Sequence, residues 1–355
     1  MPAPTRDELR ALRTAVAELM AKRSPDDDVW SELAQMGLLG LLVPEQYGGA
    51  GAGLIEVGVV AEELGRVLFP GPYLSTAVLG VNLLLALDDR QECEAVLPEI
   101  AAGRTRVAVA FTEGNSTRPP EKPATTARGG AAPVVSGEKR FSLDADTAQR
   151  LYVLADSEEG PAIFAVDPAG PGVTVEPLTT VDLSRRLCRV RFDEAPATLV
   201  GPAGQGVAAL TAALDRSAVA LLGEQAGAAR AAMEMARDYA KTRFQFGRAI
   251  GSFQAVKHMC ADMLLEAESA VSAARHVAAA GAQEAPGWTA ELALAQAYCS
   301  DAFVYVGATN IQVHGGIGFT WEHPAHRYLR RARSDAQLFG SPSWHRERYL
   351  QEIGA

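Results

Sequence analysis

The chain has 355 residues, of which 48% are hydrophobic and 21% charged, the composition of a globular protein with a large core. At about 100–200 residues per domain, this length allows two or three domains. The formal net charge of −10 argues against a nucleic-acid surface, because phosphate binding needs clustered Lys and Arg. There is no run of about 18 apolar residues and no apolar segment at the N-terminus, so neither a membrane span nor a signal peptide is expected.

The cysteines indicate a reducing environment. They lie far apart and form no CxxC pair; they are Cys93, Cys188, Cys260 and Cys299. This spacing predicts buried free thiols rather than a disulfide framework or a zinc site, so no bound metal is expected. Together with the N-terminal sequence, it favours a cytoplasmic protein.

The first part of the chain has a helical pattern. Apolar residues recur at spacings of three and four over 5–23, and Thr5 with Glu8 predicts a capping box at the start of this helix. Turn-forming PEQYGGAG and FPGP segments interrupt the region. Further helices are expected at about 28–37, 54–67, 74–87 and 89–102.

The pattern changes between Thr105 and Gly201, where short Val-rich runs alternate with Pro and Gly. Their period of two predicts antiparallel strands of a barrel or sandwich. The runs are RVAVAFT, APVVSG, RLYVLAD, GPAIFAVD, GVTVEP and LCRVRFDE. Residues 114–131, rich in Pro, Thr, Lys and Gly, are expected to form a surface loop.

Helix returns after Gly206. Long Ala-rich helices are expected at 207–243, about 252–281 and about 287–314, and the small side chains predict a closely packed bundle. The chain is therefore expected to be α+β and mostly α. Its predicted domains are an N-terminal helical domain (1–105), a middle β domain (106–205) and a C-terminal four-helix bundle (206–355).

The segment RFQFGRAIGSFQ (243–254) has side chains that suit a dinucleotide. Arg243 is a permanent cation that can bond a phosphate through two nitrogens, and Phe246 offers a flat face to an adenine or flavin ring. Gln245 and Gln254 offer amides. Taken singly, a surface ion pair and a core aromatic ring are simpler explanations.

A second segment, IQVHGGIGF (311–319), has complementary chemistry. Gln312 offers an amide, and Gly315 and Gly316 offer bare backbone that a pyrophosphate can approach closely. Glycines that only cap a helix are the simpler explanation here. The two segments together predict a dinucleotide groove.

These segments resemble the acyl-CoA dehydrogenase family. VPEQYGGAG (43–51) is similar to the family's PEEYGG loop, and 243–263 is similar to its R-x-x-F-G-x-x-I-x-x-F-Q segment. Residues 311–333 resemble its Q-x-x-G-G-x-G-[FY] segment, and the order of helices, strands and bundle matches over essentially the whole chain. The resemblance implies an FAD enzyme that dehydrogenates an acyl-CoA thioester and passes electrons to an accepting flavoprotein.

The resemblance also assigns roles to the two segments. In the family they hold the adenosine-diphosphate half of FAD across a subunit interface. The corresponding positions are Arg243, Gln245, Phe246, Gln254, Gln312, Gly315 and Gly316.

The catalytic base of the family is missing. A Glu that removes the α-proton of the thioester usually stands in a Y-E-G-T turn, which falls here at 338–341 with Phe339 in place of Glu. Some members carry the Glu on the first bundle helix, where this chain has Ser217. Glu224 lies seven residues further, about 10 Å along the helix, which is too far to replace the base unless the helix or substrate shifts. It is a weak candidate, because a Glu in an Ala-rich helix is usually solvated or ion-paired.

The flavin-ring half also departs from the family. The T-E-P-x-A-G-S-D segment is replaced by TEGNS, residues 112–116. The W-I-T segment falls at Phe141, Ser142 and Leu143, and Leu143 has no group to donate to the flavin N5 region. The isoalloxazine half is therefore expected to be eroded and the adenine half kept.

This asymmetry predicts a hetero-oligomer with a second acyl-CoA dehydrogenase chain, and otherwise a homo-oligomer. Assemblies of the α2β2 kind occur in the family with one FAD per heterodimer, for bulky substrates such as steroid side-chain thioesters. The C-terminal segment resembles their short subunits, and its basic run is either a solvated helix face or an interface. The run is Arg327, Arg330, Arg331 and Arg333. A flavin-dependent monooxygenase on the same fold and a non-catalytic paralogue that stabilises a partner remain alternatives.

Overall fold

The computed structural model describes residues 4–22, 29–130 and 132–355. The start of the chain (1–3), the predicted end of the first helix at residue 23 and the predicted start of the second at residue 28 lie outside the described residues. The chain folds into two compact units. One contains the described parts of Asp26–Gly53 and Pro70–Ser217, and the other contains those of Ala3–Pro25, Leu54–Phe69 and Ala218–Ala355.

The helical segments of the first unit lie close to their predicted positions. They are α2 (Trp30–Gln35), η1 (Leu38–Gly40), η2 (Glu45–Tyr47), η3 (Tyr73–Gly80), α4 (Val81–Leu87) and α5 (Arg90–Ala101). The predicted 74–87 helix begins as the wider π-helix η3. Two of its hydroxyls donate hydrogen bonds to residues outside this helix: Ser75 donates to Asp144 Oδ2 at 2.6 Å, and Thr76 donates to the Val107 carbonyl at 2.9 Å.

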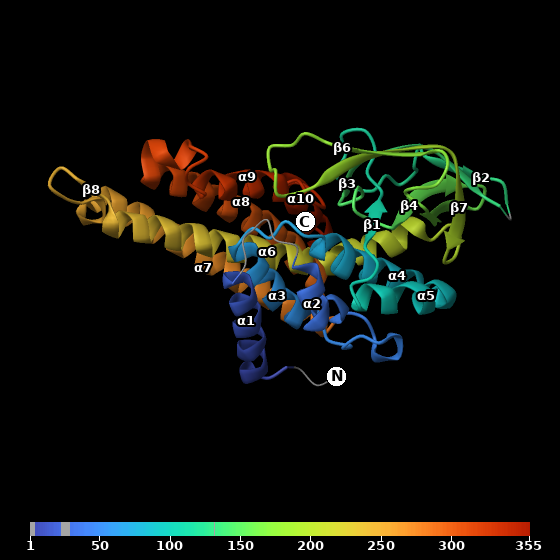
Figure 1. The fold of residues 1–355 in the computed structure, drawn as a ribbon, viewed down its shortest axis with the longest axis horizontal. Coiled ribbons are helices and arrows are strands. Elements are labelled where there is room, and N and C mark those ends of the chain that lie inside the picture. The colour runs from blue at the N-terminus through green and yellow to red at the C-terminus, as the bar shows by residue number, and fades with distance from the viewer. Residues whose placement is uncertain (1–3, 23–28, 131) are drawn as a thin grey trace. The chain divides into compact units, whose positions relative to one another are not determined.

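The strands of the first unit close into a barrel. They are β1 (Val107–Ala110), β2 (Thr126–Arg128), β3 (Val134–Leu143), β4 (Arg150–Ser157), β5 (Gly160–Val166), β6 (Val173–Pro177) and β7 (Leu187–Val200). β4 pairs with β5, β5 with β7, β7 with β3 and β3 with β2, which returns to β4. Figure 1 shows the labelled strands of this unit gathered in one region of the ribbon. The barrel core includes Leu151, Val153, Phe164 and Val190.

Two predictions for this barrel were wrong. β2 lies within 114–131, the predicted surface loop, because three residues are too short to show a period of two. The prediction of antiparallel strands fails for β1, which runs parallel to β4; β2 pairs antiparallel with β3 and makes one parallel pairing with β4. Alternation shows which residues face inward, and that pattern is the same for parallel and antiparallel neighbours.

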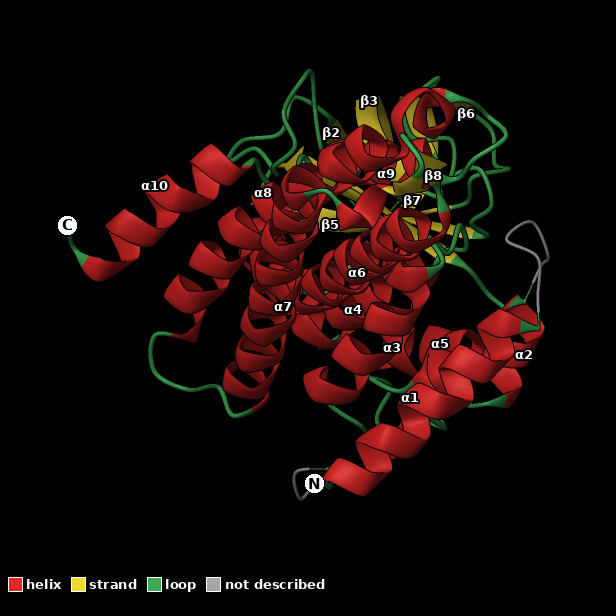
Figure 2. Ribbon diagram, turned by 90° about the vertical axis from the view of Figure 1, so that its left-hand side faces the viewer, coloured by secondary structure: helices red, strands yellow, loops and turns green. Residues whose placement is uncertain are grey.

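The second unit is a helical bundle. Its helices are α1 (Arg6–Ala21), α3 (Leu54–Arg66), the larger part of α6 (Gly206–Thr242), α7 (Gln254–Ala282), α8 (Trp288–His314), α9 (Ala325–Asp335) and α10 (Pro342–Ile353). α7 and α8 pack side by side along their lengths (Figure 2). The Thr5–Glu8 capping box is confirmed, with Thr5 N donating to Glu8 Oε2 at 2.7 Å. A Cβ at Gly227 would overlap the Glu62 carbonyl oxygen, so α3 and α6 approach this closely because glycine stands there.

The apolar stretch of α6 is a core segment. By length and composition this helix passes a membrane-span test, but 67% of the stretch is buried inside the protein, as in a core helix. The cysteines are free thiols; Cys93, Cys188 and Cys299 are buried as expected, whereas Cys260 on α7 is partly exposed. Burial raises the pKa of the Cys299 thiol to about 12, which makes it chemically inert near neutral pH.

Candidate functional site

Arg243 lies where α6 ends and a short hairpin begins. Its N–H donates to the Tyr239 carbonyl at 2.8 Å, and its carbonyl accepts from Ile250 N at 2.8 Å. The hairpin pairs β8 (Phe244–Gln245) with β9 (Arg248–Ala249). Phe246 (φ 52°) and Gly247 (φ 77°) form its turn, and two successive positive φ angles are typical of a type I′ turn. The turn leaves the Phe246 side chain 92% exposed, so Phe246 is not a core residue.

Phe253, just before α7, packs against the hairpin. Its ring meets the Phe246 ring edge to face, with centroids 6.2 Å apart. The Arg248 guanidinium lies 4.0 Å from the centroid of the Phe253 ring. Gln254 follows as the first residue of α7 and is exposed. The aromatic contact therefore fixes the hairpin against the start of α7.

The glycine segment follows α8 directly. Gly315 has φ 66° and ψ −142°, a backbone conformation that side chains disfavour. A Cβ at Gly315 or Gly316 would meet nothing within 4 Å, so both glycines face open space. Gln312, in the last turn of α8, is exposed. This turn therefore presents bare backbone next to an accessible amide.

A stack of rings joins the two segments. The Tyr239 ring on α6 stacks on His314, the last residue of α8, with centroids 4.2 Å apart. His314 also meets His323 at 4.2 Å. Tyr239 accepts the hydrogen bond of Arg243, and His314 immediately precedes Gly315, so both sequence motifs lie at the same end of the bundle. We call this surface the hairpin edge; it comprises Arg243, Gln245, Phe246, Gln254, Gln312, Gly315 and Gly316.

The groups of the hairpin edge fit an adenosine diphosphate. Among the described residues, the Arg243 guanidinium and the side-chain amides of Gln254 and Gln312 have no hydrogen-bond or ion-pair partner, so these groups are open to a ligand. The Gln245 amide donates to the Phe244 carbonyl at 2.9 Å. A free guanidinium and exposed amides suit a pyrophosphate, and the exposed Phe246 ring suits an adenine face.

The hairpin edge is surrounded by exposed aromatic rings that the sequence analysis did not single out. Phe244 is 64%, Phe319 75% and Trp321 60% exposed. Arg330 lies 4.9 Å from the centroid of the Trp321 ring. Aromatic and Arg side chains are the residues enriched at protein interfaces. The signal was present in the sequence, since aromatic residues stand in the two motif segments themselves.

The basic run of α9 divides into different roles. Arg331 is 1% exposed and pairs with Glu224 on α6. Arg327 and Arg333 are exposed, and Arg330 donates to His326 Nδ1 at 3.2 Å. The run is therefore not a uniform solvated face, because one of its members is a buried structural cation.

The positions of the family's base hold no carboxylate. Phe339 is buried, with a positive φ of 61°. Ser217 is also buried; it accepts from Asn82 Nδ2 at 3.1 Å and donates to the Ala213 carbonyl at 2.6 Å. The Glu224 carboxylate is engaged by the Arg331 guanidinium, which is the ion-paired role considered for it above.

The flavin-ring positions of the barrel are a poor fit for a flavin ring. Thr112 donates its hydroxyl to the Arg140 carbonyl, and the apolar Leu143 side chain is buried in the protein. Phe141 has φ 56° beside a register shift in β3, a bulge that changes the direction of the following side chains. Ser142 keeps a buried hydroxyl without a hydrogen-bond partner in the described part of the chain. The hydroxyl that the resemblance assigns to the flavin N5 region is thus missing at Leu143, and the neighbouring Thr112 hydroxyl is already bonded.

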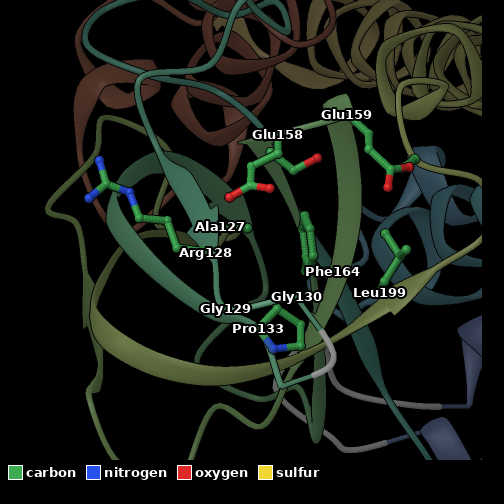
Figure 3. Close-up of a pocket in the computed structure, with 11 residues that line it drawn as sticks. Ala127, Arg128, Gly129, Gly130, Pro133, Glu158, Glu159, Phe164 and Leu199 are labelled. Atoms are coloured by element: carbon green, nitrogen blue, oxygen red, sulfur yellow. The ribbon is translucent and has the colours of Figure 1, made fainter.

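The described part of the chain also has cavities whose lining does not include the hairpin-edge residues. The first, at the barrel, has a volume of about 120 Å³ and is lined by Ala127, Phe164 and Leu199 among others (Figure 3). Pockets for cofactor-sized ligands have volumes of about 300–1,000 Å³, so this one is too small. The second is an open depression of about 720 Å³ against α1, α3, α6 and α7. Its charged groups pair with one another, as Glu62 does with Arg275 at 2.8 Å.

The sequence matches two domain profiles. Residues 6–104 match the N-terminal domain of acyl-CoA dehydrogenases, and residues 204–353 match their C-terminal domain. Acyl-CoA dehydrogenase IpdE2 of Mycobacterium tuberculosis is 33% identical over 351 residues, covering 95% of this chain and 94% of the relative. Acyl-CoA dehydrogenase FadE34 of the same organism is 38% identical over 321 residues, covering 89% of this chain but 41% of its own length.

Solved structures share the fold. A variant of the Tcur3481–Tcur3483 steroid ACAD superposes with a TM-score of 0.86 at 30% identity, covering 98% of each chain. The ChsE4–ChsE5 complex from Mycobacterium tuberculosis gives a TM-score of 0.89 at 25% identity, covering 100% of this chain and 99% of the other. A structure described as an FAD-dependent dehydrogenase gives 0.91 at 26% identity over the full length of both chains.

Proposed function

Because the chain belongs to the acyl-CoA dehydrogenase family of flavoprotein oxidoreductases, we propose that it is a subunit of an FAD-dependent acyl-CoA dehydrogenase that works with a second, different chain. One contrast carries this proposal. The hairpin edge offers a cation, amides and an aromatic face for an adenosine diphosphate, whereas the chain's own flavin-ring and base positions lack the family's groups. The chain keeps only the adenosine-diphosphate half of the FAD site, which it offers to a neighbouring subunit. This is expected if the neighbouring subunit has a different sequence and supplies the flavin-ring half itself.

The residues of the hairpin edge have binding roles in this proposal. Arg243 bonds the pyrophosphate of the FAD that the partner chain holds. Phe246 packs on the adenine, and the Gln312 amide with the backbone of Gly315 and Gly316 lines the phosphate side. When bound, FAD supplies the acceptor for the hydride that leaves the β-carbon of the acyl group.

The proton acceptor belongs to the partner in this proposal. Phe339 and Ser217 carry no ionisable carboxylate, and Glu224 is tied to the buried Arg331. A base must lie within hydrogen-bond reach of the α-proton and must be free to accept it. This chain therefore contributes binding and orientation, and the partner contributes the carboxylate.

The relatives favour a heteromer and a bulky substrate. Two of the solved structures carry names that join two chains, Tcur3481–Tcur3483 and ChsE4–ChsE5, and one of these is named a steroid ACAD. We extend this to the present chain as a steroid-like or similarly bulky acyl-CoA substrate. An electron-accepting flavoprotein as redox partner, a cytoplasmic location and domains at 1–105, 106–205 and 206–355 belong to the same proposal.

Co-expression tests the proposal. We expect the chain purified alone to be colourless, and the chain co-expressed with a second acyl-CoA dehydrogenase encoded beside it to be yellow, with a flavin absorbance spectrum. A chain that is yellow alone and saturated with FAD would contradict the need for a partner.

The missing base favours one further candidate, a flavin-dependent monooxygenase, which needs no Glu at these positions. The two enzymes differ in their electron acceptor. A monooxygenase would consume oxygen and depend on a flavin reductase, whereas the proposed dehydrogenase reduces an electron-accepting dye when given an acyl-CoA. A yellow assembly that neither consumes oxygen nor reduces the dye would favour a non-catalytic role for this chain.

A further inference from the structure

Three aromatic side chains from separate segments stack next to the hairpin edge. Tyr239 comes from the last turns of α6, His314 ends α8, and His323 precedes α9. The His314 ring lies 4.2 Å from each of the other two rings, between centroids. His314 is 4% exposed. The stack therefore joins three segments around a buried His314, with Tyr239 and His323 partly exposed on either side of it, and two of the segments carry the ligand-binding motifs.

The hydrogen bonds of His314 define its protonation. Its Nδ1 lies 2.8 Å from the Asn310 carbonyl, and because a carbonyl only accepts, Nδ1 carries the proton. Its Nε2 is buried and has no hydrogen-bond partner in the described part of the chain. If Nε2 were protonated as well, it would be a buried donor with no acceptor there. A buried donor without an acceptor lowers the stability of the folded state. The geometry favours the neutral ring.

His314 also determines where the glycine turn lies. It is covalently next to Gly315, and its Cβ lies 3.0 Å from the position that a Cβ on Gly318 would occupy. A Cβ on Gly315 or Gly316 would meet nothing within 4 Å, so the turn itself is held by little packing. Tyr239, on the other side of the stack, accepts the backbone hydrogen bond of Arg243 at 2.8 Å. The stack thus joins the segment that leads into the glycine turn to the end of α6, four residues before Arg243.

We propose that Tyr239, His314 and His323 form a clamp that sets the Gly315–Gly316 turn at a fixed place relative to Arg243, and that the clamp holds only while both imidazoles are neutral. The inference rests on the proposed function, because it gives the turn and the arginine one shared ligand. His314 is a positioning residue; it acts through the turn.

The neighbouring groups support the requirement for neutral rings. Burial is the largest cause acting on His314 and lowers its pKa; the hydrogen bond to the Asn310 carbonyl opposes this, the charge of His323 adds to it, and the pKa is lowered overall. His323 Nδ1 accepts a hydrogen bond from the Ala325 N–H at 3.2 Å, which a proton on Nδ1 would break, and burial lowers the pKa of His323. On α9, His326 has its pKa lowered by burial and then by Arg330, Arg327 and His323. Tyr239 faces His314 from α6 as a neutral ring, and Asn310 does so from α8. These neighbours are neutral or cationic, so a proton on His314 gains no opposite charge from them.

Hydrogen–deuterium exchange on the full chain tests the clamp without any cofactor. We compare wild type, His314→Ala and His314→Phe at about pH 7.5 and about pH 4.5, the second well below the ordinary His pKa because burial lowers the pKa of His314. The readout is the exchange rate of a peptide covering 311–322, corrected for its intrinsic pH dependence. The control is His276→Gln, because His276 is exposed on α7 and pairs with Glu291 instead of joining the stack.

The clamp predicts a pattern that packing alone does not. His314→Ala should exchange about tenfold faster at both pH values, as a loss of about 1.4 kcal/mol would give. His314→Phe keeps a ring that cannot titrate, so it should exchange slowly at both. Wild type and His276→Gln should be slow at the higher pH and fast at the lower. The clamp is overturned if the peptide exchanges in His314→Ala at the wild-type rate. It is also overturned if the exchange rate of wild type and that of His314→Phe rise equally when the pH is lowered.

A titration of FAD into the assembled apo-complex provides the second arm. We expect His314→Ala to raise the FAD dissociation constant about tenfold. We expect His314→Phe to stay near wild type at pH 7.5. If Arg243→Ala weakens FAD binding and His314→Ala does not, the clamp does not position the site and the inference is overturned, while the shared flavin site stands. If neither variant weakens FAD binding, the proposed function and the inference both fail.

Discussion

Removing the guanidinium of Arg243 is the most direct test of the shared flavin site. Arg243 is exposed and, among the described residues, has no side-chain partner, so Arg243→Ala removes no contact that holds this chain together. We therefore expect no change in the melting temperature of the chain alone. Any effect on FAD must come from the contact with the ligand.

The size of that effect follows from the kind of bond. A charge-assisted contact between a guanidinium and a phosphate contributes about 1.5–3 kcal/mol. Its loss corresponds to about a 10- to 150-fold weaker affinity for FAD, at 1.4 kcal/mol per tenfold. Arg243→Lys should recover only part of this, because an ammonium keeps the charge but not the paired geometry.

Flavin fluorescence during titration of FAD into the apo-complex measures the affinity. The control variant is Arg237→Ala, which removes an exposed Arg on α6 that pairs with Asp238 at 2.8 Å. We expect this control to bind FAD as wild type does. Equal affinity of wild type and Arg243→Ala would refute the reasoning, since it would mean that the hairpin edge does not contact the pyrophosphate.

Three further predictions concern buried charges. Glu224→Ala should destabilise the chain by about 3–5 kcal/mol, because it leaves Arg331 buried without this partner, and calorimetry that finds no change would indicate a functional carboxylate instead. Burial disfavours ionised Glu113, but hydrogen bonds, the largest from Lys139, outweigh it and lower the pKa. The stability from this carboxylate is therefore complete above about pH 4.5 and lost as the pH falls through the lowered pKa, so Glu113→Gln should flatten the acid limb of a melting-temperature profile. Glu62→Ala should cost about 1–3 kcal/mol in urea denaturation, since Glu62 is buried between two partly exposed Arg partners.

Much of the fold could be predicted because its signals are local. The Thr5–Glu8 capping box marks the start of α1 in the sequence and in the structure. The three long helices end within a few residues of their predicted limits, because Gly and Pro residues stand at those limits. The strand directions were only partly predictable, since the parallel partner of β1 lies some 40 residues further along the chain.

The site was predictable only as separate motifs. Arg243 and Gly315 carry recognisable chemistry in the sequence, but the ring contact between Tyr239 and His314 that brings their segments together leaves no pattern there. Pairs of residues far apart in sequence meet through tertiary packing, which periodicity does not report. The same reason explains Glu224, whose partner Arg331 lies 107 residues away.

The exposed rings of the hairpin edge and its surroundings have a consequence for how the chain exists in a cell. Phe244, Phe246, Phe319 and Trp321 together form an apolar surface of the kind that promotes aggregation when it stays uncovered. A subunit made in excess of its partner would carry this surface into the solvent, where chaperones and proteases recognise such groups. In the proposed heteromer, balanced synthesis of the two chains is therefore a requirement that the hairpin edge imposes, and the yield of soluble protein should rise with the supply of the partner.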